Sequence, residues 1–347
     1  MSTTICAAPT TSRVARITRP RRGFAARRAA LGAVLAVTAL VLSGCGLRLE
    51  TPPPVEPSPD ALEQVRARTV DDALALQSAA QDALTTTTDE QVLPLLDQVV
   101  TFSEQHVAAL GGEYDSGLDA DPDEAPTPSP TPTVATTTAQ DVLALLGDTT
   151  TTAGTDANST TDGPLARLIA SVAVSRADLT DRLASALGED SPGPAVPEQV
   201  VVPPEVDADV AGPLARAHDE AGYALEVLAA RGPEQTRAAT LASARAHRAA
   251  ADAWANAAAI AGTEQDPRLA QYALPTDLDA DGALSALGVA VQDGIAHVST
   301  AAIAAVPAGT RDTYLDSLRV AVSEARALGA AASAFPGMPE QAAPATP

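Results

Sequence analysis

Cysteine is nearly absent from this chain of 347 residues, which contains only Cys6 and Cys45. Two cysteines cannot form a disulfide framework, and they are too few for a Cys₄ or Cys₃His zinc site. The protein must therefore be stabilised by its hydrophobic core. Its length is sufficient for two ordinary domains.

Aromatic residues are also scarce and make up only 2% of the chain, with a single tryptophan. A β-sandwich of this size normally uses more aromatic and β-branched side chains in its core. The core must instead be built from alanine, leucine, valine and isoleucine, which allow helices to pack closely. The composition therefore predicts an all-α protein.

Positive charge is limited, because lysine is absent and 22 arginines face 44 aspartates and glutamates. Seven of the arginines and none of the acids lie in residues 1–44, so removal of that segment would leave a net charge of −29. A chain this acidic repels nucleic acid and anionic membrane surfaces, so neither is an expected electrostatic partner. We interpret the acids as a solvated surface, with a cation-attracting field as the alternative.

The apolar run 29–42 is too short, at about 14 residues, to span a membrane, and it has the length of a signal-peptide hydrophobic region. Arginines precede it, and the sequence Leu-Ser-Gly-Cys follows at Leu42, Ser43, Gly44 and Cys45. This order resembles the bacterial lipoprotein signal. The resemblance implies that residues 1–44 are removed and that Cys45 receives acyl chains such as palmitate, which anchor it to the membrane. An ordinary secretory signal with a chance cysteine is the alternative.

The export route has a second reading, because Arg21 and Arg22 in "RRGFAA" resemble the twin-arginine signal. The match is partial, since Pro20 stands where serine or threonine is usual and Ala25 replaces leucine. General secretion and the twin-arginine route, which carries folded proteins, both stay open. Either route places the protein on the outer face of the cell membrane.

Composition divides the remainder of the chain. Residues 45–58 are rich in proline and predict an extended stalk. Residues 59–190 predict an N-terminal helical domain with two disordered inserts. The first insert, 119–137, is acidic and rich in proline and threonine, and the second, 148–162, is rich in threonine.

A second domain is expected after a linker, 191–206, that contains five prolines. Residues 207–337 hold four long helical patterns, with one long loop among their connections. These patterns predict a four-helix bundle. Residues 338–347 are expected to form a tail.

The second domain also resembles a known family. The stretches "LARAHDEAGYALEVLAAR", "AHRAAADAW", "YALP" and "FPGMPE" resemble the ferritin-like domain of unknown function 4439, found in lipoproteins and other proteins of high-GC Gram-positive bacteria. The resemblance covers roughly residues 207–340 and implies a ferritin-like bundle without an established activity. His218 stands where members often carry glutamate, and Gln292-Asp293 stands where a Glu-Asp pair is expected.

Catalytic motifs do not appear in the sequence. A di-iron carboxylate bundle needs two Glu-x-x-His motifs, and the chain contains none. It also lacks a Gly-rich phosphate loop, a Gly-x-Ser-x-Gly elbow and a His-Glu-x-x-His motif. No cofactor is therefore expected, and an enzymatic activity is not indicated.

Four polar side chains of the second domain form the one constellation of interest. His218 and His247 lie on the apolar stripes of their helices, near the middle of each, so antiparallel packing would bring them to one level. Asp293 and His297 share one face of a later helix. We interpret these histidines, and the lone His106, as core residues bonded to a carboxylate or tyrosine. A divalent-metal site made of His218, His247, Asp293 and His297 is the alternative. Glu220, Tyr223 and Glu324 are expected near the same level.

Two functions follow from these observations. The leading hypothesis is a non-enzymatic envelope lipoprotein whose helical scaffold binds a partner or ligand. The alternative is a metal-binding or redox ferritin-like protein with a histidine site in the second domain.

Overall fold

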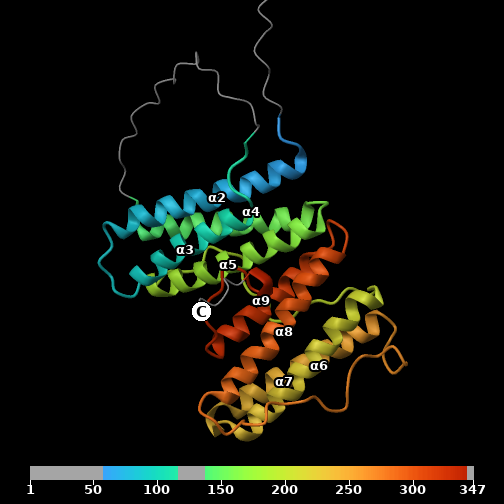
Figure 1. The fold of residues 1–347 in the computed structure, drawn as a ribbon. Helices are drawn as coiled ribbons and strands as arrows, with labels where there is room; N and C mark the ends of the chain where they lie inside the picture. The colour runs from blue at the N-terminus through green and yellow to red at the C-terminus, as the bar shows by residue number, and fades with distance from the viewer. Residues whose placement is uncertain (1–57, 116–136, 342–347) are drawn as a thin grey trace, which may run out of the picture. The chain divides into compact units, whose positions relative to one another are not determined.

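A computed structural model describes residues 58–115 and 137–341, and all its regular structure in these ranges is helical (Figure 1). The prediction of an all-α protein is confirmed. The proposed signal, Cys45 and the stalk up to residue 57 lie outside the described residues. The same holds for residues 119–136 of the first insert and 342–347 of the tail.

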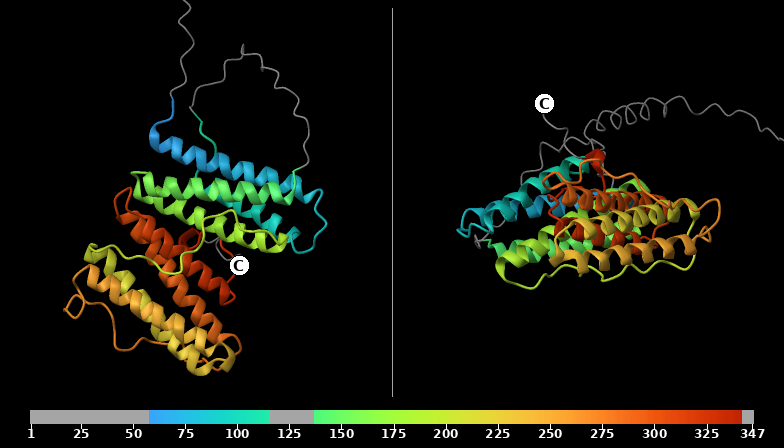
Figure 2. Two further views of the ribbon diagram at one scale, coloured as in Figure 1. Left: turned by 180° about the vertical axis from the view of Figure 1, so that it is seen from behind. Right: turned by 90° about the horizontal axis from the view of Figure 1, so that it is seen from below.

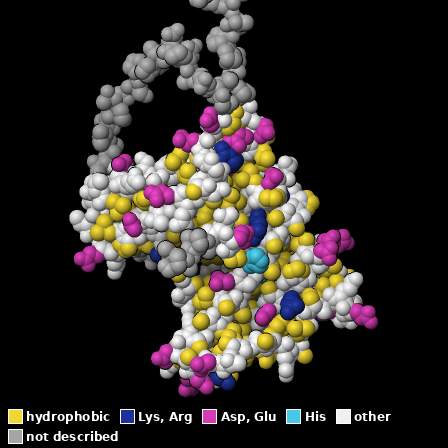
Figure 3. Space-filling model, viewed as in Figure 1, with side chains coloured by type: hydrophobic (Ala, Val, Ile, Leu, Met, Phe, Trp, Pro, Cys, Tyr) yellow, Lys and Arg dark blue, Asp and Glu magenta, His cyan; other side chains and the backbone are white. Residues whose placement is uncertain are grey.

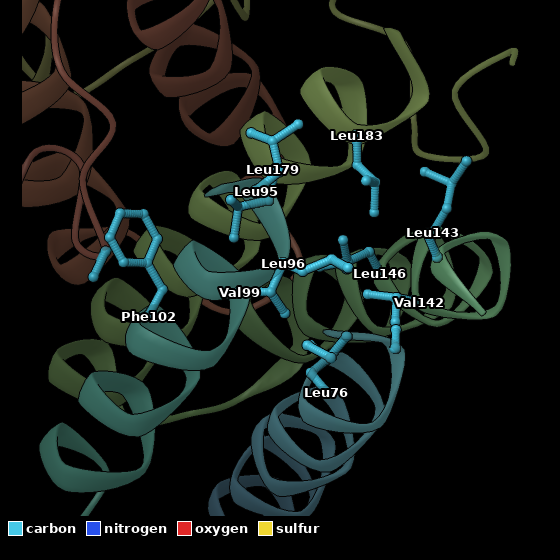
Figure 4. Close-up of a cluster of buried hydrophobic side chains, with 14 of the residues drawn as sticks. Leu76, Leu95, Leu96, Val99, Phe102, Val142, Leu143, Leu146, Leu179 and Leu183 are labelled. Atoms are coloured by element: carbon cyan, nitrogen blue, oxygen red, sulfur yellow. The ribbon is translucent and has the colours of Figure 1, made fainter. Parts of the chain in front are cut away.

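The first four helices pack around one apolar core. They are α2 (Ala61–Leu84), α3 (Leu93–Ala109), α4 (Ala139–Ser159) and α5 (Gly163–Leu187). Figure 4 shows side chains from all four converging on this core, which contains Leu76, Leu95, Leu96, Val99, Phe102, Val142, Leu143, Leu146, Leu179 and Leu183.

The expected disorder of residues 148–162 is wrong, because most of this segment belongs to α4. The threonine hydroxyls of Thr149, Thr151 and Thr152 donate to backbone carbonyls four residues earlier, so the helix itself satisfies them. Thr150 and Ala153 are buried, and α4 packs along the length of α5. Small side chains on this face permit that close packing, although their composition is typical of a disordered tract.

The last four helices form two antiparallel hairpins. They are α6 (Ala208–Arg231), α7 (Glu234–Ala257), α8 (Ala283–Ala305) and α9 (Asp312–Ala327). Short turns join α6 to α7 and α8 to α9, whereas a long connection joins α7 to α8. A four-helix arrangement with one long crossover is the connectivity of ferritin-like bundles.

Two domains were expected on either side of the linker 191–206, and the structure packs these two parts against each other. The described residues form one compact unit. A single apolar cluster takes Ile169 from α5, Leu214 from α6 and Ile303 from α8. The hairpin α8–α9 lies between the α2–α5 layer and the α6–α7 hairpin in Figure 1 and in the left view of Figure 2. The proline-rich segment therefore connects two parts of one compact unit.

Arg311 connects the two halves of the chain by hydrogen bonds. Its side chain is only 2% exposed. The guanidinium donates to the carbonyls of Ala157 and Thr160 at the C-terminal end of α4, at 2.9 and 2.6 Å. It also donates to the carbonyls of Ile303 and Val306 at the end of α8, at 2.9 and 3.2 Å. One arginine thus satisfies carbonyls at two helix ends that have no partner within their own helices.

The C-terminal segment (residues 328–341) returns from α9 to the first core. Ala334, Phe335 and Met338 are buried there among side chains of α3 and α5. Ser175 Oγ donates to the carbonyl of Ser333 at 3.0 Å, and Ser171 Oγ donates to that of Pro336 at 2.8 Å. The expected tail therefore begins later than residue 338, because Met338 is part of the core.

His106 on α3 receives this segment. Its Nε2 lies 2.9 Å from the carbonyl oxygen of Ala334, and its ring meets that of Phe335 edge-on with centroids 5.3 Å apart. The carbonyl can only accept, so Nε2 carries the proton. The interpretation of His106 as a structural core residue agrees with these contacts.

Acidic side chains are spread over the visible face of the molecule rather than gathered in one patch (Figure 3). This distribution matches the interpretation of the acids as a solvated surface. Among the described residues one helix, α8, is long and apolar enough to cross a membrane. Half of that apolar stretch is buried, as is usual for the core helix of a bundle.

Candidate functional site

A polar cluster at the centre of the α6–α9 bundle receives one side chain from each helix. These are His218 from α6, His247 from α7, Gln292 from α8 and Glu324 from α9. His218 and His247 continue the apolar stripes of their helices and are each only 4% exposed. The expectation that the two histidines meet at one level is therefore correct.

The cluster is connected by short contacts. The Nδ1 atoms of His218 and His247 lie 3.0 Å apart, and the two rings are tilted by 32°. On its other side, His247 Nε2 lies 2.8 Å from Glu324 Oε2. The amide of Gln292 also donates to this carboxylate oxygen.

The 2.8 Å contact between His247 Nε2 and Glu324 indicates where the protons lie in the neutral state, although the amide nitrogen of Gln292 also lies 3.0 Å from His247 Nε2. The Glu324 carboxylate only accepts, so His247 Nε2 carries its proton and His247 Nδ1 is an acceptor. His218 Nδ1 must then carry the proton shared between the two rings. His218 Nε2 is left as a buried acceptor without a hydrogen-bond partner among the described residues, as is Gln292 Oε1.

Burial keeps His218 neutral. It lowers the pKa of His218 from 6.5 to about 3, and the neighbouring His247 acts in the same direction. Burial likewise lowers the pKa of His106 to about 3, aided by Arg176 and opposed by the bond to Ala334. Both histidines must remain uncharged for the folded protein to accommodate them.

Stability is therefore expected to fall as the pH drops below 6.5. The unfolded chain binds protons on these histidines near pH 6.5, whereas the folded chain binds them only near pH 3. Their contribution is complete above pH 6.5, and about 2 kcal/mol per histidine is lost by pH 5. Urea unfolding of the protein between pH 8 and pH 5 measures this loss.

The double variant His106→Gln and His218→Asn should flatten the pH dependence of the free energy of unfolding in that window. His297→Gln is the matched control, because this histidine is exposed. A loss of stability below pH 6.5 that is equally steep in the double variant would contradict the assignment.

A second polar network borders the cluster and attaches the long loop to α6. Tyr272, from the "YALP" stretch, donates to Asp219 Oδ2 at 2.8 Å, and Arg248 donates to Asp219 Oδ1 at 2.5 Å. Burial raises the pKa of Tyr272 to about 12, so its hydroxyl keeps its proton. The ring of Tyr223 packs against Tyr272 with centroids 5.9 Å apart. Tyr223 thus packs against the loop, whereas the histidine pair is hydrogen-bonded to Glu324.

The structure separates the four residues considered as a metal site. His218 and His247 are together, whereas Asp293 and His297 lie on an exposed face of α8 and line a different cavity. Glu324 was expected near this level and is bonded to His247. The missing partner was Gln292, which the sequence presented only as a departure from a family pattern. Gln292 directly precedes Asp293 in the sequence, and this adjacency was the signal that could have identified it.

The cluster takes one side chain from each of four helices, and a di-iron carboxylate bundle likewise draws its ligands from four helices. Such a site needs one glutamate from each of two helices and Glu-x-x-His from each of the other two. Here His218 and Gln292 stand for the two glutamates, and the motifs read Ala244-x-x-His247 and Ala321-x-x-Glu324. One carboxylate remains in the cluster, so these residues do not fit a di-iron centre.

This conclusion extends to the whole described part of the chain, in which no group of three or more histidine, cysteine, aspartate or glutamate side chains is arranged to hold a metal ion. Three cavities on the surface have other linings. Residues of α3, α5 and α9 line the first, α8, α9 and the C-terminal segment line the second, and α4 with α9 lines the third. His218 and His247 are absent from all three linings.

Comparison with known proteins places the cluster within a family. Residues 214–340 match the family described as "Domain of unknown function (DUF4439)". No curated protein and no solved structure matches the chain. The matched range contains the four cluster residues, the loop with Tyr272 and most of the C-terminal segment, and it excludes α2–α5.

Proposed function

We propose that the protein is a lipid-anchored envelope protein. Its residues 214–340 form a DUF4439 domain, and its helical body binds a ligand or partner without catalysing a reaction. The observation that carries the second half of this proposal is the closed bundle centre. His218 and His247 are each 4% exposed. The protons of the histidine pair are shared within the cluster, which leaves a substrate no route to either ring.

The sequence supports the first half of the proposal. The Leu-Ser-Gly-Cys motif at residues 42–45 follows an arginine-rich start and a short apolar run. Two acyl chains on Cys45 would hold the protein at the outer face of the membrane, where a net negative charge gives no attraction to anionic lipids. A binding role requires no catalytic group, in agreement with the lack of catalytic motifs.

Cys45→Ala should release the protein from the membrane or leave it unprocessed. The thioether to the acyl chains cannot form without the cysteine sulfur, so the anchor is lost. Membrane fractionation in the native host, combined with mass measurement of the N-terminal peptide, tests this. Cys6→Ala, which removes the other cysteine, is the matched control and should fractionate like the natural protein. Retention of the Cys45→Ala protein in the membrane at mature size would refute the anchor.

A second candidate function is the binding of a single divalent metal ion by the polar cluster. It is favoured by His218 Nε2 and Gln292 Oε1, two buried acceptors that lack hydrogen-bond partners in the described chain. Elemental analysis of protein purified from its native envelope decides between the two candidates. Under the leading proposal, the metal content is below stoichiometric and the double variant His218→Ala with His247→Ala loses only stability. Stoichiometric metal that disappears in this variant would establish the second candidate instead.

A further inference from the structure

A cavity of about 400 Å³ lies between α8, α9 and the C-terminal segment. This volume is within the range of small-molecule sites. Most of the wall is apolar and includes Val289, Val322, Phe335 and Met338. We call it the α8–α9 cavity, and it is separate from the polar cluster at the bundle centre.

The polar groups of the α8–α9 cavity are mostly engaged with one another. Arg326 donates to the carbonyl of Ala330, and its Nε lies 3.2 Å from Asp178 Oδ1. Asp178 also accepts from Arg182 at 3.3 Å. The ion pair with Asp178 balances the charge of Arg326, although Arg326 Nε makes no hydrogen bond within the described chain.

Asp293 and His297 are the other ionisable side chains that line this cavity. His297 Nδ1 lies 3.3 Å from the carbonyl oxygen of Gly337, so Nδ1 carries a proton. Asp293 lies one turn before His297 on the same face of α8 and makes no hydrogen bond or ion pair with the described residues. Partial burial raises the pKa of Asp293, because its carboxylate has lost part of its hydration.

A ligand that complements these groups must bring hydrogen-bond donors, a positive charge and an apolar body. Asp293 would repel a carboxylate or phosphate, and the guanidinium in the lining, that of Arg326, is already ion-paired with Asp178. A neutral alcohol would leave the charge of Asp293 uncompensated. A primary ammonium group on an aliphatic chain satisfies both Asp293 and the apolar wall.

We propose that the α8–α9 cavity binds a primary aliphatic amine, with its ammonium group on Asp293 and its chain along Val289, Val322 and Phe335. The inference rests on the proposed binding function and gives it a site and a ligand class. The chain contains no lysine. The ammonium group therefore comes from another molecule, either a free amine or the lysine side chain of a peptide.

Isothermal titration of the full-length protein in detergent with hexylamine tests the proposal. Hexan-1-ol and hexanoate are the matched neutral and anionic probes. Hexylamine is expected to bind at least about tenfold more tightly than either, since only the ammonium forms a charge-assisted hydrogen bond with Asp293. Equal affinity for the three probes, or no detectable binding of hexylamine, would overturn the proposal.

Two variants localise the binding. Asp293→Asn should weaken hexylamine binding about tenfold or more, and Ala331→Trp should fill the cavity and abolish binding. Both residues are exposed, so the variants should keep their thermal unfolding midpoints. Glu234→Gln, which removes an exposed carboxylate on α7, is the matched control and should leave the affinity unchanged. Unaltered binding in Asp293→Asn would place the amine elsewhere and refute the site.

Competition identifies the source of the amine. If an acetylated and amidated Gly-Lys-Gly peptide displaces hexylamine, the site accepts a lysine side chain. If it does not, the site is restricted to free amines. Failure of every amine to bind would leave the membrane anchor untouched, because Cys45→Ala tests the anchor independently.

Discussion

Alanine in place of Gly337 should lower the free energy of unfolding by about 3–5 kcal/mol. Gly337 has a φ of +75°, a conformation that costs other residues about 1–2 kcal/mol. A Cβ atom there would also lie 2.5 Å from the carbonyl oxygen of Ala296 and 2.6 Å from Thr300 Cγ2. The backbone of α8 cannot yield easily, so the C-terminal segment would have to move away and leave the first core incomplete.

Gly282→Ala is the matched control for this effect. Gly282 has nearly the same φ, +76°, and nothing lies within 4 Å of the position of its Cβ. This variant should lose only the conformational cost of about 1–2 kcal/mol. Guanidinium unfolding followed by circular dichroism measures both. Equal losses in the two variants would mean that the contact between Gly337 and α8 contributes nothing to stability.

Loss of the Arg311 side chain should be comparably harmful. In Arg311→Ala the carbonyls of Ala157, Thr160 and Ile303 would remain buried without their donor. Unpaired buried acceptors and the lost charged hydrogen bonds together cost about 3–5 kcal/mol. Because Arg311 contacts both halves of the chain, unfolding of the variant should begin at the ends of α4 and α8. Native-state hydrogen exchange can measure that local opening.

Arg245→Ala is the control for Arg311, since Arg245 is an exposed arginine on α7. Its removal should change the free energy of unfolding by less than about 0.5 kcal/mol. Arg311→Lys should recover little of the lost stability, because one ammonium group cannot reach carbonyls at two helix ends. A loss below about 1 kcal/mol in Arg311→Ala would show that water replaces the guanidinium.

The helical class and most helix positions could be predicted because periodic apolar residues report directly on a buried face. The histidine pair was predictable for the same reason, since His218 and His247 continue such stripes. The threonine-rich end of α4 was not predictable in this way. Its helix depends on contact with α5 and on hydroxyl bonds to its own backbone, and composition alone carries neither signal.

The packing of both halves into one compact unit was equally unpredictable from the sequence. A proline-rich stretch between two helical regions usually marks a domain boundary, and residues 191–206 have that composition. What unites the halves is the apolar cluster shared by α5, α6 and α8, together with long-range contacts through His106, Arg311 and the C-terminal segment. Contacts of this kind leave no periodic pattern. The sequence also suggested Asp293 and His297 as partners of the histidine pair. In the structure the rotation of α8 turns both side chains away from the pair.

The return of the C-terminal segment to the first core has a consequence for biosynthesis. Ala334, Phe335 and Met338 are translated after all eight described helices, yet they complete a core whose other members come mainly from α2 to α5. The nascent N-terminal half therefore leaves the ribosome with part of its apolar surface uncovered, and its folding cannot finish during synthesis. General secretion, one of the two export routes considered for this chain, threads unfolded chains and would be compatible with that delay. A pathway that accepts only folded cargo would have to wait until the whole chain had been released.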